Sequence, residues 1–335
     1  MIGLRRGLVR GARIAALGVH VPERVLTNDE ISQFLDTSDE WITTRTGIRE
    51  RRVARVDEAT SDLAEVAARR CLQSGGVDPA ELDLVIVTTI SPDHMMPATA
   101  SIVCDRIGAT RAGAFDIQAG CTGFVYGLAT ATAFVSAGIY RNVLVLGAEV
   151  LSKILDWEDR STCVLFGDGA GAVLVQPTDN GSIFSFDLGN DGSGAPYLTI
   201  PAGGTREPAS LDSVRGRRHT MHMTGSEVFR FATRTVVESC EKVLADAGVG
   251  VGDVDLFVPH QANIRIIESA ARRLGFSDGQ VFANLDRYGN TSCASIPICL
   301  HEASRSGRLK KGDTLLMAGF GAGLTWGSCL TRWEL

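Results

Sequence analysis

The sequence lacks the cysteine pattern of a zinc site or of a disulfide framework. Its eight cysteines are scattered along the chain, with no CxxC pair and no regular spacing. This distribution is typical of a protein from a reducing cytosol. The chain also lacks an excess of positive charge, because its formal net charge is -6 over 335 residues. A general affinity for nucleic acid is therefore not indicated.

No hydrophobic run is long enough to indicate a membrane span. The longest apolar stretch follows Cys121 and is interrupted by Gly, Thr and Ser, which favours a helix buried in a globular core. The first residues, MIGLRRGLVRGARIAALGVHVP, place arginines before a short apolar stretch but offer no convincing cleavage site. We interpret them as a loose basic extension followed by the first strand of a cytoplasmic protein.

Two patterns that often signal a cofactor are incomplete. The glycine-rich segments FGDGAGA and GFGAG do not have the GxGxxG spacing before a helix that binds dinucleotides. His219 and His222 have a spacing that could chelate a metal, but the sequence offers no further ligands nearby. We therefore predict neither a metal nor an organic cofactor.

The chain does contain an internal repeat. Strand-like and helical patterns alternate throughout, which predicts a layered α/β fold. The segments CLQSGGVDPAELDLVIV (71–87) and VLADAGVGVGDVDLFVP (243–259) align without a gap at an offset of 172 residues. A second matched pair, 136–149 and 305–320, follows in the same order. Two matches in one order indicate a duplication of one α/β unit.

The repeat predicts two halves, 1–180 and 181–335, related by a pseudo-twofold axis. The first half carries Cys121, and the offset of 172 residues places Cys293 at the equivalent position of the second half. If the halves face each other, the N-termini of two equivalent helices converge. Asn290, just before Cys293, is then expected near Cys121.

Three polar residues stand at strand ends or turns. Cys121 lies between glycines at the start of the apolar helix, where the helix macrodipole favours a thiolate. His260 follows an apolar strand in VPHQAN, and Asn290 stands in the turn YGNTS. The segment AGFGAGLTWG (318–327) predicts a glycine-rich hairpin that lets backbone N–H groups approach a ligand.

A thiol, an imidazole and a carboxamide in this order suit carbon–carbon bond formation from thioesters. The cysteine would carry an acyl group, and the other two side chains would donate hydrogen bonds to an enolate oxygen. Each residue also has an ordinary interpretation, as a buried core cysteine, a strand-end histidine or a turn asparagine. A cysteine hydrolase uses Cys, His and Asn in the same order, but its signature around the nucleophile is absent. A non-catalytic partner of a carrier protein is a further alternative, but it would be expected to lose the cysteine.

Several long motifs identify a family. The segments TNDEI, DTSDEWITTRTGIRERR, FGDGAGA, VPHQANIRII, GNTS and GFGAGLTWGS occur in order over nearly the whole chain. Together they resemble β-ketoacyl-acyl carrier protein synthase III, a condensing enzyme of the thiolase superfamily that initiates fatty-acid synthesis. The resemblance implies a five-layered αβαβα fold, a homodimer and a ping-pong reaction. Cys121 would be acylated by acyl-CoA, and His260 and Asn290 would then assist the decarboxylation of malonyl-acyl carrier protein.

The same resemblance assigns further residues. The oxyanion hole would consist of the N–H groups of Cys121 and Ala322. The CoA site would be formed by Trp41 and Arg160 around the adenine, with Arg45, Gly225 and Asn263 along the pantetheine tunnel. The acyl pocket would involve Met96, Leu151 and Phe166, with Met96 reaching across the dimer. Carrier-protein docking would use Arg230, Arg265, Arg272 and Arg273, since Arg265 and Arg272 share a helix face.

The sequence departs from the family pattern at three places. The N-terminus is longer than in compact members, Cys293 stands where alanine is common, and Met96 replaces a phenylalanine that some members have in the acyl pocket. Methionine is adaptable, so acetyl, branched and longer primers all stay open. The alternative function is a specialised synthase III-like condensing enzyme or acyltransferase of a secondary-metabolite (polyketide) pathway.

Overall fold

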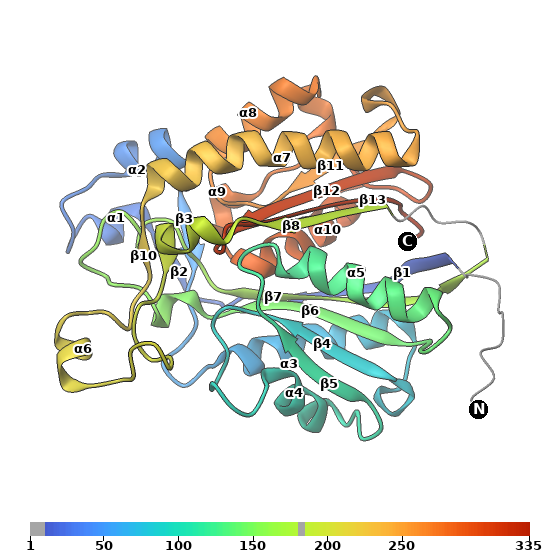
Figure 1. The fold of residues 1–335 in the computed structure, drawn as a ribbon, viewed down its shortest axis with the longest axis horizontal. Helices are drawn as coiled ribbons and strands as arrows, with labels where there is room; N and C mark the ends of the chain where they lie inside the picture. The colour runs from blue at the N-terminus through green and yellow to red at the C-terminus, as the bar shows by residue number, and fades with distance from the viewer. Residues whose placement is uncertain (1–10, 180–184) are drawn as a thin grey trace.

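Two β-sheets alternate with three layers of helices, which confirms the predicted five-layered αβαβα fold (Figure 1). The computed structural model describes residues 11–179 and 185–335. The basic extension expected at residues 1–10 lies outside the described residues. So does the expected boundary between residues 180 and 181.

The first sheet has five strands in the order β1-β7-β6-β4-β5. Its strands are β1 (Gly11–His20), β4 (Leu84–Thr88), β5 (Gly113–Ile117), β6 (Val143–Glu149) and β7 (Gly169–Thr178). The central strands β4 and β6 run parallel and are buried along their whole length, which explains their continuous apolar sequences. Its outer face is covered by α3 (Thr60–Gly75) and α4 (Thr99–Ile107), which form the lower layer in Figure 1.

The second sheet repeats this strand order. It contains β8 (Ser185–Asn190), β11 (Leu256–Pro259), β12 (Thr314–Gly321) and β13 (Thr325–Arg332), in the order β11-β12-β13-β8. Val281 forms an isolated parallel bridge with Phe257 at the edge where the first sheet has β5. Two helices, α7 (Gly225–Ala247) and α8 (Ile264–Leu274), lie over the outer side.

The offset of 172 residues has a structural basis. Asp83 precedes β4 and accepts a hydrogen bond of 2.9 Å from the backbone N–H of Asn142, just before β6. Asp255 and Thr314 make the equivalent contact at 2.8 Å in the second sheet. Gly248 ends α7 with a φ of 66°, and its counterpart ends α3 with a φ of 62°. The repeated sequence therefore encodes a repeated helix end and a repeated clamp between neighbouring strands.

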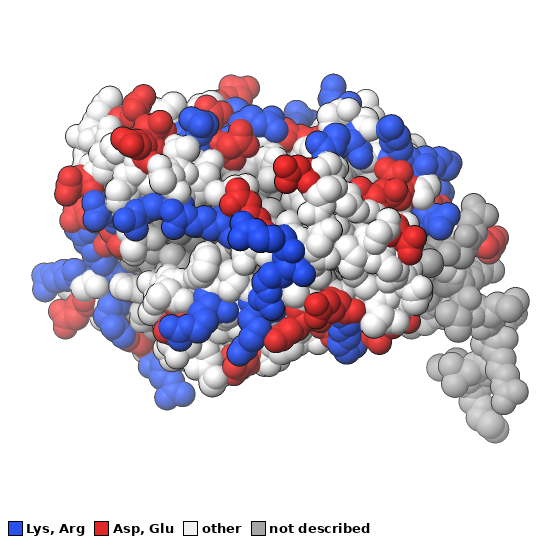
Figure 2. All heavy atoms as spheres, turned by 90° about the horizontal axis from the view of Figure 1, so that it is seen from above, with Lys and Arg blue, Asp and Glu red and all other residues white. Residues whose placement is uncertain are grey.

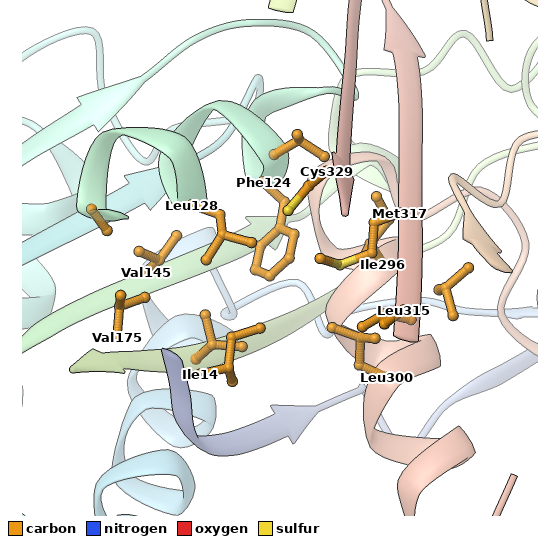
Figure 3. Close-up of a cluster of buried hydrophobic side chains, with 14 of the residues drawn as sticks. Ile14, Phe124, Leu128, Val145, Val175, Ile296, Leu300, Leu315, Met317 and Cys329 are labelled. Carbon is orange, nitrogen blue, oxygen red and sulfur yellow. The ribbon is translucent and has the colours of Figure 1, made fainter. Parts of the chain in front are cut away.

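The central helical layer holds the site in place. It consists of α5 (Gly123–Ser136) and α10 (Ser295–Arg305), which contact both sheets. Figure 3 shows their side chains meeting those of the sheets, with Phe124, Leu128, Ile296 and Leu300 beside Val145 and Met317. A Cβ on Gly127 would lie 2.7 Å from the side chain of Thr88, so α5 packs directly on the first sheet. The start of α5 is thereby fixed relative to both sheets.

Smaller elements connect and cover these layers. The short strands are β2 (Val25–Thr27), β3 (Glu50–Arg52), β9 (Leu198–Thr199) and β10 (His222–Met223). The short helices are α1 (Asn28–Ile31), α2 (Asp39–Thr46), α6 (Leu211–Arg215) and α9 (Leu285–Tyr288), with 3-10 turns at Pro79–Glu81, Leu151–Lys153, Gly192–Tyr197, Val251–Asp253, Asp278–Gln280 and Ser292–Ala294. Within the described ranges, none of the helices has the length and apolar character needed to cross a membrane.

Candidate active site

One cavity receives the side chains of Cys121, His260 and Asn290. Cys121 lies between β5 and α5, and His260 directly follows β11. Asn290 lies between α9 and the 3-10 turn that leads into α10. All three residues are buried, with exposed fractions of 4%, 2% and 6%. The rest of the lining is largely apolar and includes Phe166, Leu198, Val228, Ile266 and Phe320. The three polar groups that the sequence singled out therefore meet in a space that is poor in water.

The glycine-rich hairpin between β12 and β13 lies against Cys121. Gly120 has a φ of 57°, and a Cβ placed on it would lie 2.5 Å from the backbone N of Ala322. A Cβ on Gly321 would lie 2.3 Å from the backbone N of Cys121. These close approaches bring the two segments that carry the expected oxyanion-hole N–H groups together, and only glycine permits them.

We expect Gly120→Ala to slow acylation of Cys121 by about a hundredfold, because the new methyl group would displace the backbone around Ala322 by a large fraction of an ångström. The control is Gly76→Ala, since Gly76 has a similar φ of 62° but, in the described part of the chain, no atom beyond its chain neighbours lies within 4 Å of the added carbon. Both variants place alanine at a positive φ, which strains the backbone. Only Gly120→Ala also brings the new methyl group too close to the backbone of Ala322. Equal acylation rates for the two variants, measured by mass spectrometry, would contradict the assigned role of this contact.

Burial dominates the protonation of Cys121. It raises the pKa of the thiol to about 12, although contact with the Ser292 side chain lowers it. The sequence predicts a thiolate favoured by the helix N-terminus, and burial of the sulfur opposes this effect. The physical reason is that α5 begins only at Gly123, while the sulfur has lost the water that would solvate its charge. Nucleophilic attack by Cys121 therefore needs a nearby group that accepts its proton.

His260 is held as a neutral hydrogen-bond donor. Its Nδ1 lies 2.7 Å from the hydroxyl of Ser295, which also accepts a hydrogen bond from the backbone N–H of Gln261. We assign the hydroxyl proton to the hydrogen bond with Nδ1, which places the ring proton on Nε2. Nε2 is buried and has no hydrogen-bond partner among the residues that the structure describes. Because the ring lines the cavity, this N–H is available to a bound substrate.

The buried state of His260 predicts a pH profile. Burial lowers the pKa of the imidazole to about 3, below its ordinary value of 6.5. The ring therefore stays neutral as the pH falls through 6.5, whereas an exposed histidine would become charged. We expect the condensation step, started from preformed acyl-enzyme, to show no acidic limb with an apparent pKa near 6.5. A limb at that pH in stopped-flow measurements would contradict this environment for His260.

Asn290 is oriented by its own backbone and by Ser292. Its N–H donates to the carbonyl of Leu165, and its carbonyl accepts from Gly167. Its side-chain Oδ1 accepts a hydrogen bond of 2.8 Å from the backbone N–H of Ser292. With the oxygen occupied, the Nδ2 group of Asn290 is left as a donor toward the cavity. Ser292 has a φ of 46°, a conformation that non-glycine residues rarely adopt and that often marks functional sites.

The residues expected to bind CoA form a connected path to the cavity. Asn263 and Gly225 line the cavity itself, and Asn263 donates through Nδ2 to the backbone carbonyl of Arg45. The guanidinium of Arg45 lies over the ring of Trp41, 4.7 Å from its centroid. Arg160 also lies 4.7 Å from the Trp41 centroid. Trp41 and Arg160 therefore touch directly, and an adenine can enter between them only if the guanidinium moves.

The three residues expected around the acyl pocket have different locations. Phe166 lines the cavity, and Leu151 is fully buried behind it in the same apolar cluster. Met96 is 86% exposed and does not line the cavity. A single chain thus brings Phe166 to the site and leaves Met96 on the surface.

The arginines expected to dock a carrier protein lie on the two outer helices. Arg230 is on α7, and Arg265, Arg272 and Arg273 are on α8, all of them exposed. Arg273 donates a hydrogen bond to the carbonyl of Thr233, which ties the two helices together. Figure 2 looks onto this side and shows a band of Lys and Arg side chains among acidic ones.

Two of the polar groups near the site were not predicted from the sequence. Ser295 fixes the tautomer of His260, and Glu149 is fully buried at the end of β6. Ser295 belongs to the segment that follows Asn290, so its proximity could have been inferred from that motif. Glu149 has a weaker signal, which is a single charged residue that ends an apolar strand.

Comparison with known proteins shows the family of this chain. Residues 115–192 match the family model 3-Oxoacyl-[acyl-carrier-protein (ACP)] synthase III, and residues 244–333 match the model of its C-terminal part. The chain is 54% identical over 322 residues to β-ketoacyl-[acyl-carrier-protein] synthase III of Desulfitobacterium hafniense, covering 96% of this chain and 97% of that protein.

Solved structures of related proteins share the fold of this chain. The synthase III of Thermus thermophilus is 48% identical, with a TM-score of 0.89 over 96% of this chain and 99% of that chain. A priming β-ketosynthase from the R1128 polyketide biosynthetic pathway is 39% identical, with a TM-score of 0.91 over 99% of both chains.

Proposed function

The chain belongs to the 3-oxoacyl-[acyl-carrier-protein] synthase III family, and we propose that it performs this family's condensation with Cys121, His260 and Asn290. The product is a β-ketoacyl-acyl carrier protein, formed from an acyl-CoA primer and malonyl-acyl carrier protein. The assignment of these three residues rests on one observation, which is that their side chains line the same largely apolar cavity. The proposed reaction requires no metal and no organic cofactor.

The first half-reaction is acyl transfer to Cys121. The thiolate attacks the acyl-CoA carbonyl, and the carbonyl oxygen becomes negatively charged in the tetrahedral intermediate. The backbone N–H groups of Cys121 and Ala322 stabilise this oxygen, since the β12–β13 hairpin packs against the Cys121 loop. Collapse of the intermediate expels CoA and leaves an acyl-cysteine.

The second half-reaction is decarboxylative condensation. Loss of carbon dioxide from malonyl-acyl carrier protein leaves an enolate, and its thioester oxygen takes up negative charge. The Nε2–H of His260 and the Nδ2–H of Asn290 donate to this oxygen, because both side chains line the cavity and Nε2 has no hydrogen-bond partner among the described residues. The enolate carbon then attacks the acyl-cysteine and forms the new carbon–carbon bond.

We assign binding of the CoA moiety to the residues along the path from Trp41 to the cavity. We expect Trp41→Ala to raise the KM for acyl-CoA about tenfold with little change in kcat, because the adenine loses its stacking surface. The control is Phe34→Ala, which removes another partly exposed aromatic ring, 55% exposed, outside this path. A fall in kcat without a change in KM would contradict the binding role of Trp41.

We assign the exposed arginines of α7 and α8 to the acidic carrier protein, because they lie on one side of the molecule.

We further propose a homodimer in the cytoplasm. β5 is an edge strand, and Asp116 on it accepts a hydrogen bond from the backbone N–H of Thr99 at the start of α4. Met95 and Met96, 80% and 86% exposed, precede this helix and form an apolar surface that a second copy would cover.

Steady-state kinetics test the proposed function. With acyl-CoA and malonyl-acyl carrier protein varied together, a ping-pong reaction gives parallel double-reciprocal lines. A specialised condensation that primes a polyketide is the second candidate, favoured by the 39% identity to the R1128 priming enzyme. Turnover only with a polyketide carrier protein would select it, and thioester hydrolysis without condensation would reject both.

A further inference from the structure

Arg51 is a fully buried cation to which the proposed reaction gives no role. It lies on β3 and has an exposed fraction of 0%. Burial lowers the pKa of its guanidinium to about 10, so the group stays charged at neutral pH. None of the ion pairs in the described ranges involves Arg51. A charge without water or a counter-ion is costly unless polar groups surround it, so the contacts of the guanidinium show what it holds together.

The guanidinium joins β3 to two other segments of the chain. Its Nη1 donates to the backbone carbonyl of Leu26 at 3.1 Å and to Oδ1 of Asn28 at 2.8 Å. Its Nη2 donates to the backbone carbonyl of Val164, 113 residues later in the chain, at 2.7 Å. Because a guanidinium presents its donors in a rigid planar fork, these bonds fix the three segments relative to one another.

Asn28 determines how this fork is oriented. It is 1% exposed, and its Nδ2 donates to Oδ1 of Asp39 and to the backbone carbonyl of Ile48, each at 2.8 Å. With Nδ2 occupied in this way, the carboxamide oxygen is left to accept from Arg51. The contact gives a structural reason for two residues of the motifs TNDEI and GIRERR that the proposed reaction does not use.

The segment that Arg51 holds supports Asn290. Val164 begins the segment 164–167, which includes Phe166 in the wall of the cavity. This segment exchanges two backbone hydrogen bonds with Asn290, of 2.8 and 3.0 Å, and forms an isolated parallel bridge with it. The position of the Asn290 backbone therefore depends on a segment that Arg51 ties down at Val164.

Arg51 also packs against the turn that carries Asn290. A Cβ placed on Gly289, the residue before Asn290, would lie 3.2 Å from Cβ of Arg51 and 2.8 Å from the carbonyl oxygen of Leu165. A Cβ placed on Gly167 would lie 3.0 Å from the same atom of Arg51. Arg51 therefore lies against both chain segments of the bridge that supports Asn290.

We propose that Arg51 is a positioning residue for condensation, because its guanidinium holds the segment 164–167 and thereby places the carboxamide of Asn290 where the enolate oxygen forms. This inference rests on the proposed function, in which Asn290 donates to that oxygen. Arg51 does not line the cavity, so it acts on Asn290 and not on the substrate. Cys121 and Ala322, which carry the oxyanion-hole N–H groups, make none of these contacts, so acylation is insensitive to Arg51.

Arg51→Lys tests this role, because lysine keeps the positive charge but cannot donate to several partners as a rigid fork. We expect condensation, started from preformed acyl-enzyme, to slow by about 10- to 100-fold, because a small displacement of one donor is enough for such a loss. Acylation of Cys121 at saturating acyl-CoA should change by less than about twofold, because its oxyanion donors come from other segments. Both rates are measured by quenched mass spectrometry.

Arg70→Lys is the matched control. Arg70 also donates to a backbone carbonyl, that of Val19 at 2.7 Å, but it lies on α3 and does not line the cavity. Both half-reactions should keep their wild-type rates in this variant. Unchanged condensation in folded Arg51→Lys, or equal slowing of acylation and condensation, would overturn the proposal.

A double-mutant cycle separates positioning from a general loss of stability. If Arg51 acts through Asn290, Arg51→Lys should lose its effect on condensation in the Asn290→Ala background and keep it in the His260→Ala background. A merely structural role would slow condensation equally in both backgrounds. Equal slowing would therefore overturn the proposal.

Asn28→Ala carries the same test if Arg51→Lys does not fold, because it removes one acceptor of the fork and leaves Arg51 in place. We expect it to slow condensation about fivefold, which is the effect of one lost hydrogen bond, and only where Asn290 is present. Unchanged condensation in this variant would overturn the proposal. Failure of the proposed function has a different signature, which is the absence of an acyl adduct from acyl-CoA on wild-type protein.

Discussion

Cys121→Ala is expected to lower β-ketoacyl-acyl carrier protein formation by at least about three orders of magnitude. The reason is chemical, because alanine has no atom that can hold the acyl group between the two half-reactions. Structural damage should be small, since the side chain is buried and the methyl group occupies part of the same space. The measurement is the initial rate of ketoacyl product, together with the melting temperature.

Cys293→Ala is the matched control for this prediction. Cys293 is also buried and stands at the equivalent position of the second half, where its sulfur donates to the backbone carbonyl of Gly120 at 3.2 Å. It lies beside the site without a proposed covalent role, so most of the activity should survive. Equal losses in Cys121→Ala and Cys293→Ala would contradict the assignment of the nucleophile.

His260→Ala and Asn290→Ala are expected to separate the two half-reactions. Each removes one donor to the enolate oxygen, so condensation should slow by about 10²- to 10³-fold. Acylation of Cys121 should continue, because neither side chain belongs to the hairpin that approaches the Cys121 backbone. The two rates are measured separately, acylation by quenched mass spectrometry and condensation by mixing acyl-enzyme with malonyl-acyl carrier protein.

His301→Ala serves as the control for the histidine variant, since His301 lies on α10 and does not line the cavity. It should leave both half-reactions unchanged. If His260→Ala instead blocked acylation as strongly as condensation, His260 would be the base for Cys121.

The architecture could be predicted from the sequence because the repeat leaves local chemical signals. Asp83 and Asp255 clamp equivalent strands, and Gly248 ends its helix as its counterpart ends α3, so the same residues recur at the same offset. The convergence of Cys121 and Asn290 followed from that symmetry. The strand that would complete the second sheet gave no comparable signal, and it is reduced to a single bridge at Val281.

The protonation of the site could not be predicted from motifs. A cysteine before a helix suggests a thiolate, but the depth of burial at Cys121 depends on the β12–β13 hairpin about 200 residues later in the chain. Glu149 was missed for a similar reason. Its partners Thr89 and Ser91 come about 60 residues earlier in the chain, so only the fold shows that a buried carboxyl group lies near the thiol.

The contact between Trp41 and Arg160 is a further difference between the sequence prediction and the structure. The sequence predicted an adenine between an indole and a guanidinium, whereas the two groups lie against each other in the chain alone. A cation next to an aromatic face is favourable without a ligand, so this closed arrangement has its own stability. Met96 also differs from the sequence prediction, since it is 86% exposed and does not line the cavity.

Intact-protein mass spectrometry tests the central claim most directly. Wild-type protein is mixed with a panel of acyl-CoAs, and malonyl-acyl carrier protein is then added. We expect one acyl adduct that maps to Cys121 and disappears as β-ketoacyl-acyl carrier protein forms, and the CoA that gives it identifies the primer. No adduct with any acyl-CoA, or an adduct on another residue, would contradict the role of Cys121.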